Sequence, residues 1–245
     1  MSPNDFNSFR TLSTKAPNSI SKEEALAKCE SLYEKIDKFQ NKLSAKPDFS
    51  VLILFQGMDA SGKDGAIRKL ASHLNPQGFD VVSFKAPTEE ELNHDFLWRV
   101  HSKTPAKGRI TFFNRSHYED ILVTKVHDLI SEKTYKERID HINHFEKLLT
   151  DNNTALIKFF LDISKEEQRE RLDERINTPE KNWKYNAGDE VERKLWAKYS
   201  DIYEDIFDKC SPKNAPWYCV PADNKWYRDL VIAEIVYDIL KEKWQ

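Results

Sequence analysis

The stretch that decides the fold is 51–65, which reads VLILFQGMDASGKDG. An apolar run, Val51–Phe55, leads into a loop with Gly57, Gly62 and Lys63, and an amphipathic helical pattern follows. A strand, a glycine-containing loop and a helix in this order form the phosphate-loop motif G-x-x-x-x-G-K-[ST]. Its glycines let backbone N–H groups face an anion, the helix start adds partial positive charge, and the lysine adds a full charge. The alternative is a glycine turn that matches by chance. We expect phosphate binding at Gly57, Ala60, Ser61, Gly62, Lys63 and Asp64.

One position departs from the motif. Asp64 stands where Ser or Thr usually offers a hydroxyl to Mg²⁺, and a second carboxylate, Asp59, lies inside the loop. Mg²⁺ is a hard cation that prefers oxygen ligands. The sequence therefore indicates that Asp59 takes over the metal contact.

Composition bounds the class of protein. The 245 residues are 39% hydrophobic, enough for one large α/β domain or two small ones, and the net charge of −3 argues against bulk binding of nucleic acid or membrane. Three cysteines without a C-x-x-C pair indicate a reducing compartment. Met1–Ile20 lacks an apolar signal region. We therefore expect a cytoplasmic protein with no nucleic-acid and no membrane partner.

Strand-like and helical runs alternate along most of the chain. Residues 1–21 are rich in Ser, Asn and Pro and predict a flexible tail, or an arm that docks on another surface; 22–245 are expected to form a single domain. The alternation predicts a three-layer α/β/α fold with a five-stranded parallel sheet, which binds ligands beyond the carboxyl ends of its strands. The expected strands are 51–55, 81–84, 109–113, 155–162 and 217–221, and the expected helices are 21–43, 62–75, 89–100, 118–126, 131–151, 165–176, 190–208 and 225–244.

A second motif follows the third expected strand, which ends Phe113-Asn114-Arg115. Phosphate-loop enzymes place a second Mg²⁺ contact at such a strand tip, where Arg115 would face the phosphates. Asn114 can coordinate through its carbonyl oxygen but brings no charge. The alternative is that Asn114 caps the following helix, and both roles can hold at once.

A basic run precedes and overlaps this strand. Residues 99–118 contain Arg99, Lys103, Lys107, Arg109 and Arg115 and no acidic residue. In a net-acidic chain such a surface is suited to a run of phosphates. A solvated loop is an equally good interpretation.

The segment 168–188 has the pattern of a lid. Arg171 and Arg175 share a helix face, the helix breaks at Pro179, and Lys181 and Lys184 follow. Lids close over phosphates and exclude water. The alternative is ordinary pairing along the helix, such as Glu167 with Arg171.

Two further patterns are weaker signals. Lys85 follows the second expected strand, where an acceptor could bind, although it could equally be a solvated lysine. An aromatic stripe at helical spacing predicts core packing or a subunit contact, and it consists of Trp196, Tyr199, Tyr203 and Phe207.

Taken together, these residues resemble the family-2 polyphosphate kinases. The resemblance covers roughly 24–244 and is carried by six ordered blocks: GMDASGKDG at 57–65, SFKAPT at 83–88, HDFLWR at 94–99, FNRSHYED at 113–120, the lid-like 171–185, and 215–226. Six blocks in order are far more specific than a phosphate loop alone.

The resemblance implies a P-loop kinase fold, homo-oligomers (dimers or tetramers), and reversible phosphoryl transfer, dependent on Mg²⁺ or Mn²⁺, between inorganic polyphosphate and nucleotides. Asn114 with Glu119 resembles the subgroup that uses both mono- and diphosphates, which implies AMP and ADP as acceptors, ATP as product, and GMP and GDP as further candidates. The residues assigned on this reading are Asp59, Lys63, Arg115 and Arg175 for catalysis, Arg171 for phosphate, Arg68, Lys103 and Lys107 for polyphosphate, Lys85, Asn114, Glu119 and Asp120 for nucleotide, and Asp59 and Asn114 for metal.

Two other functions share parts of this pattern. An NTP-dependent nucleoside monophosphate kinase of the thymidylate-kinase kind also has a phosphate loop, a strand-tip arginine and an arginine-bearing lid, but it leaves the basic run without a purpose. A phosphate-sensing module without turnover would fit the missing hydroxyl after Lys63 and the neutral Asn114.

Overall fold

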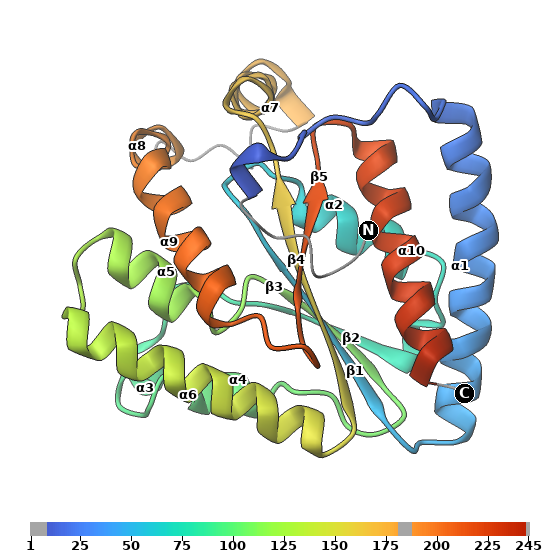
Figure 1. Cartoon of the computed structure of the whole chain (residues 1–245), viewed down its shortest axis with the longest axis horizontal. Helices are drawn as coiled ribbons and strands as arrows, with labels where there is room; N and C mark the ends of the chain where they lie inside the picture. Colours follow the sequence, from blue (N-terminus) through green and yellow to red (C-terminus); the bar gives the residue numbers. More distant parts are fainter. Residues whose placement is uncertain (1–8, 181–187, 244–245) are drawn as a thin grey trace.

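A five-stranded parallel sheet forms the centre of the molecule (Figure 1). The computed structural model describes residues 9–180 and 188–243. The strand order is β2-β3-β1-β4-β5, and every neighbouring pair is parallel. Every residue of β1 and of β4 is buried, because helices cover both faces of a parallel sheet. The predicted fold class is confirmed. The strands are β1 Ser50–Gln56, β2 Phe79–Ser83, β3 Ile110–Asn114, β4 Thr154–Asp162 and β5 Trp217–Pro221.

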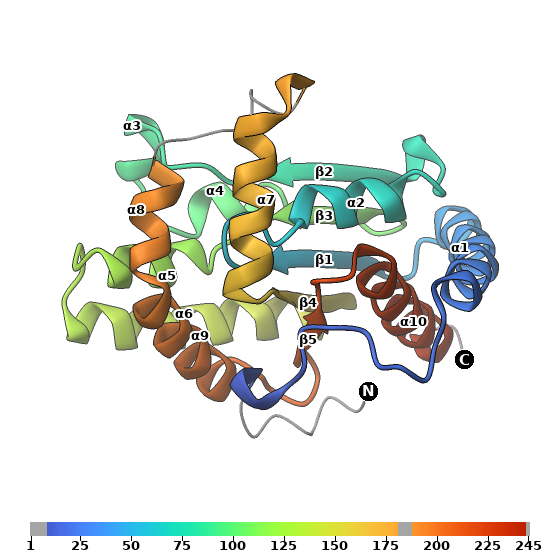
Figure 2. The ribbon, with the colours of Figure 1, turned by 90° about the horizontal axis from the view of Figure 1, so that it is seen from above.

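Two cores lie on opposite faces of the sheet (Figure 2). Side chains of a strand alternate between faces, so Val51 and Ile53 enter one core while Leu52 and Leu54 enter the other. The first core is covered by α1 (Lys22–Ala45), α2 (Lys63–Ala71) and α10 (Lys225–Lys243). The second is covered by α5 (Glu119–Val126), α6 (Glu132–Asp151) and α9 (Trp196–Lys209).

Two predicted helices are in fact interrupted. The expected helix 89–100 is two short ones, α3 (Glu89–Leu92) and α4 (Trp98–His101). Between them the Asp95 carboxylate accepts the Leu97 N–H at 3.0 Å, a local bond that competes with the helical ladder. The expected helix 190–208 is α8 (Gly188–Lys194) followed by α9. The remaining elements are α7 (Lys165–Asn177) and the 3₁₀ turns η1 (Phe9–Thr11) and η2 (Pro76–Gly78).

The carboxyl ends of the strands meet at one edge of the sheet (Figure 2). The loop after β1, the Asn114–Arg115 turn after β3 and the start of α7 after β4 therefore gather there. Of the expected tail, residues 1–8 lie outside the described residues, whereas 12–20 run along the domain and Ile20 packs on the first core. Within the described chain, no helix is long and apolar enough to cross a membrane.

Candidate active site

The loop after β1 has the backbone geometry that its glycines predict. Gly57 has a φ of +147°, and a Cβ there would lie 2.7 Å from the Leu161 carbonyl oxygen on the neighbouring strand. Gly62 has a φ of +99° and caps the start of α2. Both positions lie where L side chains are strained, so the sequence needs glycine at each. Ala60 also adopts a positive φ, of 61°.

Lys63 lies inside this loop rather than on the surface. Its Nζ donates to the carbonyl oxygens of Gly57 at 2.8 Å and Met58 at 3.1 Å. Burial, and then the nearby charge of Arg115, lower the pKa of Lys63 to about 8. The loop thus holds a cation at the place where the motif predicts phosphate binding.

Two buried arginines hold the loop from behind. Arg171 donates to the carbonyl oxygens of Ala60 at 3.0 Å and Ser61 at 2.9 Å, and Arg228 donates to that of Gly62 at 3.2 Å. Their other N–H groups bind Glu167, the Ala222 and Asp223 carbonyls, and Asp229.

This arrangement corrects the assignment of Arg171 to phosphate. All five N–H groups of Arg171 donate to protein oxygens, and its side chain is 8% exposed. It holds the carbonyls of Ala60 and Ser61 in place. The pairing with Glu167, left open as an alternative, is present at 2.7 Å.

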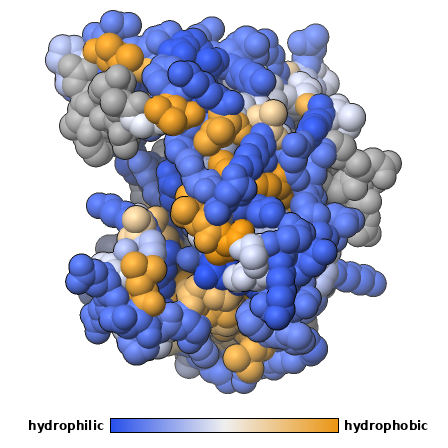
Figure 3. All heavy atoms as spheres, turned by 90° about the vertical axis from the view of Figure 1, so that its left-hand side faces the viewer, coloured by the Kyte–Doolittle hydropathy of each residue, from blue (hydrophilic) through white to orange (hydrophobic). Residues whose placement is uncertain are grey.

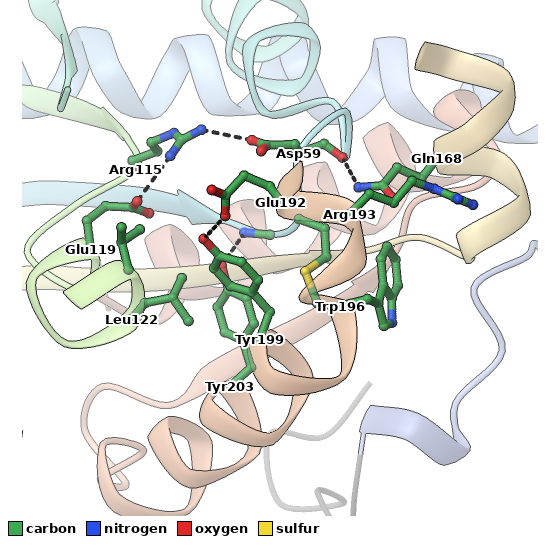
Figure 4. Close-up of a pocket in the computed structure, with 13 residues that line it drawn as sticks. Asp59, Arg115, Glu119, Leu122, Gln168, Glu192, Arg193, Trp196, Tyr199 and Tyr203 are labelled. Carbon is green, nitrogen blue, oxygen red and sulfur yellow. Dashed lines mark hydrogen bonds and ion pairs between the residues drawn. The ribbon is translucent and has the colours of Figure 1, made fainter. Parts of the chain in front are cut away.

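Arg115 faces the loop from the tip of β3. It sits at a φ of +62°, and its guanidinium contacts Asp59 at 2.8 Å and Glu119 at 3.1 Å (Figure 4). Glu119, and to a lesser degree Asp59, raise the pKa of Arg115 against the effect of burial. Glu119 also accepts from Gln56 Nε2 at 3.0 Å. The structure therefore brings Asp59, Arg115 and Glu119 together as predicted.

Asn114 pairs with the carboxylate of Asp64, the residue that departs from the motif. Its amide Nδ2 is the donor, which leaves Asn114 beside the loop rather than capping α5, whose N-cap is Tyr118. Two carboxylates, Asp59 and Asp64, thus lie on the loop, and their charges both act on Lys63. Among the described residues, no three His, Cys, Asp or Glu side chains form a preformed metal cluster.

A small cavity lies between the loop and the helices α5, α7, α8 and α9 (Figure 4). Its volume is about 30 Å³, far below the roughly 300–1,000 Å³ of small-molecule sites. The side of the molecule that carries α5, α8 and α9 shows apolar side chains between hydrophilic borders (Figure 3). The lining residues are Gly57, Met58, Asp59, Arg115, Glu119, Leu122, Val123, Gln168, Glu192, Arg193, Trp196, Tyr199 and Tyr203.

Several of these wall residues were not predicted as functional. The Tyr203 hydroxyl accepts the Gly57 N–H at 3.2 Å, and Gln168 Nε2 donates to the Asp59 carbonyl at 3.0 Å. The Tyr199 hydroxyl donates to Glu192 at 2.6 Å. The aromatic stripe predicts core packing or a subunit contact. Tyr203, at 1% exposure, packs in the core, and its hydroxyl also reaches the loop.

The lid helix α7 brings Arg175 toward the same site. Arg175 ion-pairs with Asp189 of α8 at 3.0 Å. Burial, and then the charge of Asp59, raise the pKa of Asp189, which places this pair within electrostatic reach of the loop. Lys181 and Lys184 of the expected lid lie outside the described residues.

The structure places part of the basic run elsewhere. Arg109 donates to Asp80 at 2.9 Å before β3 begins, so Arg109 and Lys107 lie at the amino edge of the sheet, opposite the loop. This position argues against the assignment of Lys107 to polyphosphate. Lys103 and Arg68 are exposed.

Asp120 and Lys85, both assigned to nucleotide, lie in different environments. Asp120 is 9% exposed and pairs with Arg99 at 3.2 Å, and burial raises its pKa. Its pairing with Arg99 argues against the assignment of Asp120 to nucleotide. Lys85 is exposed, and its carbonyl accepts from Arg99 at 2.9 Å.

Comparison with known proteins identifies the family. The family model described as Polyphosphate kinase 2 (PPK2) matches residues 19–245. The AMP/ADP-polyphosphate phosphotransferase of Meiothermus ruber is 45% identical over 220 residues, which cover 90% of this chain and 82% of that protein. The ADP-polyphosphate phosphotransferase of Rhodopseudomonas palustris is 42% identical, with coverage of 85% and 76%. The crystal structure of polyphosphate kinase 2 from Arthrobacter aurescens TC1 superposes with a TM-score of 0.94 at 36% identity, over 97% of this chain and 86% of that chain. The resemblance is confirmed: this chain is a phosphotransferase that belongs to the polyphosphate kinase 2 family.

Proposed function

We propose that the protein transfers phosphoryl groups between inorganic polyphosphate and the nucleotides AMP and ADP. The observation that carries this proposal is a pair of cations, Lys63 and Arg115, at the carboxyl ends of the strands: Arg115 ion-pairs with Asp59, and the charges of Arg115 and Asp59 both act on Lys63. The relative at 45% identity, whose name includes both AMP and ADP, supports the choice of acceptors. Guanine nucleotides and a homo-oligomeric assembly stay predictions.

The two cations would stabilise the negative charge of the phosphates rather than transfer protons. Phosphoryl transfer needs little covalent help from the protein, and positioning with charge neutralisation supplies most of the rate. Lys63 and the loop N–H groups would bind oxygens around the transferred group, while Arg115 and Arg175 would stabilise charge on its equatorial oxygens. A phosphate acceptor is already anionic, so the reaction requires no general base.

The residues present fit Mg²⁺ as a partner of the phosphates. Mg²⁺ usually binds one or two carboxylates together with substrate phosphates rather than a cage made only of protein. Asp59 and Asp64 on the loop meet that description, and Asn114 lies against Asp64. Bound there, the ion would neutralise phosphate charge, and Asp59 would hold it next to Arg115.

The site also bears on the NTP-dependent alternative. Part of the basic run that argued against that alternative lies at the opposite edge of the sheet, so it no longer discriminates. The family discriminates between the two donors, because the names of the matching relatives include polyphosphate. We therefore favour polyphosphate over an NTP as the phosphoryl donor.

The test is ATP formation from ADP, and ADP formation from AMP, with long-chain polyphosphate and Mg²⁺. We expect Lys63→Ala to lower kcat by about 10²–10³, the effect of removing one preorganised charge-stabilising donor. Lys69→Ala is the matched control, since Lys69 lies on the same helix but pairs with Glu30 at 3.2 Å. No turnover by the wild type with either acceptor, or near-normal turnover by Lys63→Ala, would contradict the proposal.

A further inference from the structure

The N-terminal arm, residues 9–20, runs across the edge of the sheet that carries the site. Figure 2 shows η1 beside α9 and the following residues passing over the end of β5. Arg10 ion-pairs with Asp201 and Glu204 of α9. The Ala16 N–H donates to Asn224 Oδ1, after β5, at 2.9 Å. The arm therefore joins two of the elements that surround the site.

Asp223 is the centre of this contact. Its Oδ2 accepts the Thr14 hydroxyl at 2.7 Å, and its N–H donates to the Thr14 carbonyl at 3.0 Å. Its Oδ1 accepts the N–H of Ser164 at 2.8 Å, and Ser164 is the N-cap of α7. A single carboxylate, on a residue that is 8% exposed, thus ties the arm to the N-cap of α7.

From Asp223 the contacts continue to the phosphate loop. The Asp223 carbonyl accepts from Arg171 at 3.2 Å, and Arg171 donates to the carbonyls of Ala60 and Ser61. The contacts therefore run from Thr14 through Asp223 and Arg171 to the phosphate loop.

We propose that the arm is a strap that positions the lid helix and the phosphate loop, with Thr14 as a positioning residue that acts through Asp223. Thr14 touches none of the cavity-lining residues through a hydrogen bond of its own; its influence passes along Asp223 and Arg171. Geometry of the loop matters most in the transition state, so the strap should act on kcat more than on the KM for nucleotide. The activity readout rests on the proposed function.

The experiment compares three variants of the full chain. Thr14→Val keeps the shape of the side chain but removes the hydroxyl, and we expect kcat to fall by about tenfold, the size of one lost hydrogen bond to a charged group. Thr14→Ser should restore most of it. Ser13→Ala is the control, since among the described residues its hydroxyl bonds to the backbone of Lys15 in the arm and to no other element. A kcat for Thr14→Val within about twofold of wild type, or an equal loss in Ser13→Ala, would overturn the proposal.

Amide hydrogen exchange tests the strap without any turnover. In Thr14→Val, the amides at the start of α7 and in the loop 57–63 should exchange faster than in wild type, whereas those of α6 should not change. Unchanged exchange at α7 and the loop would reject the strap even if the protein proved to have another activity.

Discussion

Raising the pH above 7 is expected to remove the positive charge of Lys63 and with it the activity. Burial, and then Arg115, lower the pKa of Lys63 to about 8, so its ammonium begins to lose its proton in the range where enzymes are routinely assayed. Only the charged form can stabilise phosphate oxygens. The kcat/KM for polyphosphate, which reports the free enzyme, should therefore follow the fraction of Lys63 that is protonated.

The size of the effect follows from this pKa. At pH 7 about nine tenths of Lys63 is charged, and at pH 9 about one eleventh, so kcat/KM should fall by roughly tenfold over this interval. Bound phosphates favour the ammonium and raise its pKa again. The descending limb of kcat should therefore lie at higher pH than that of kcat/KM.

The assay is the initial rate of ATP formation at subsaturating polyphosphate between pH 6.5 and pH 9.5. Lys63→Arg is the control, because a guanidinium keeps its charge throughout. Its rates should be lower at every pH but flat in this range, and both enzymes share any titration of the substrates. A wild-type kcat/KM that is constant from pH 7 to pH 9, or the same descending limb in Lys63→Arg, would refute the reasoning.

Three further predictions follow from the same structure. Burial, and then Asp223, raise the pKa of Asp162 to about 7. Between about pH 4 and pH 7 the folded protein therefore keeps a proton on Asp162 that the unfolded chain loses. The stability of the fold falls as the pH rises through this range. In urea unfolding, Asp162→Asn should therefore raise the free energy of unfolding at pH 8, by about 4 kcal/mol at most, and not at pH 4; an equal gain at both would contradict it. Asn114→Asp should keep activity but change the ratio of AMP to ADP use, and steady-state kinetics that show both falling in proportion would make Asn114 structural. Lys107→Gln should leave the KM for polyphosphate within about twofold, because the length of β3 separates Lys107 from the loop by more than the roughly 8 Å screening length; a large rise would place polyphosphate at the amino edge.

The parts of the site that lie in one continuous stretch were predictable from sequence. The loop from Gly57 to Lys63 follows a buried strand directly, so its backbone geometry is set by local residues and by the neighbouring strand. Arg115 follows a second buried strand, and parallel pairing of β1 with β3 sets Phe55 opposite Asn114. Position in a parallel sheet was therefore enough to bring Arg115 to the loop.

The same geometry explains why the basic run 99–118 does not gather as a whole at the site. A strand runs from the amino end of the sheet to its carboxyl end. Residues that precede β3 and residues that follow it therefore lie at opposite ends of the strands. Charges that are close in sequence, such as Lys107 and Arg115, are thus separated by the length of the strand between them. A charge count along 99–118 cannot detect this separation unless the strand within the run is taken into account.

Arg171 and Tyr203 show where sequence reasoning reaches its limit. Both residues lie on helices. The spacing of side chains along a helix predicts which of them share a face, but not which part of the protein that face contacts. Here the contacted residues, Gly57 and Ala60, lie far away in the sequence. Arg171 was expected to bind phosphate, yet it binds the loop carbonyls; Tyr203 was expected to pack in the core, yet its hydroxyl binds Gly57. The loop needs both kinds of support, because backbone N–H groups can face an anion only while the carbonyls between them are held elsewhere. The carbonyl and amide groups of the loop need hydrogen-bond partners, and the residues that supply them make the site rigid. Only the folded chain shows which side chains reach these groups.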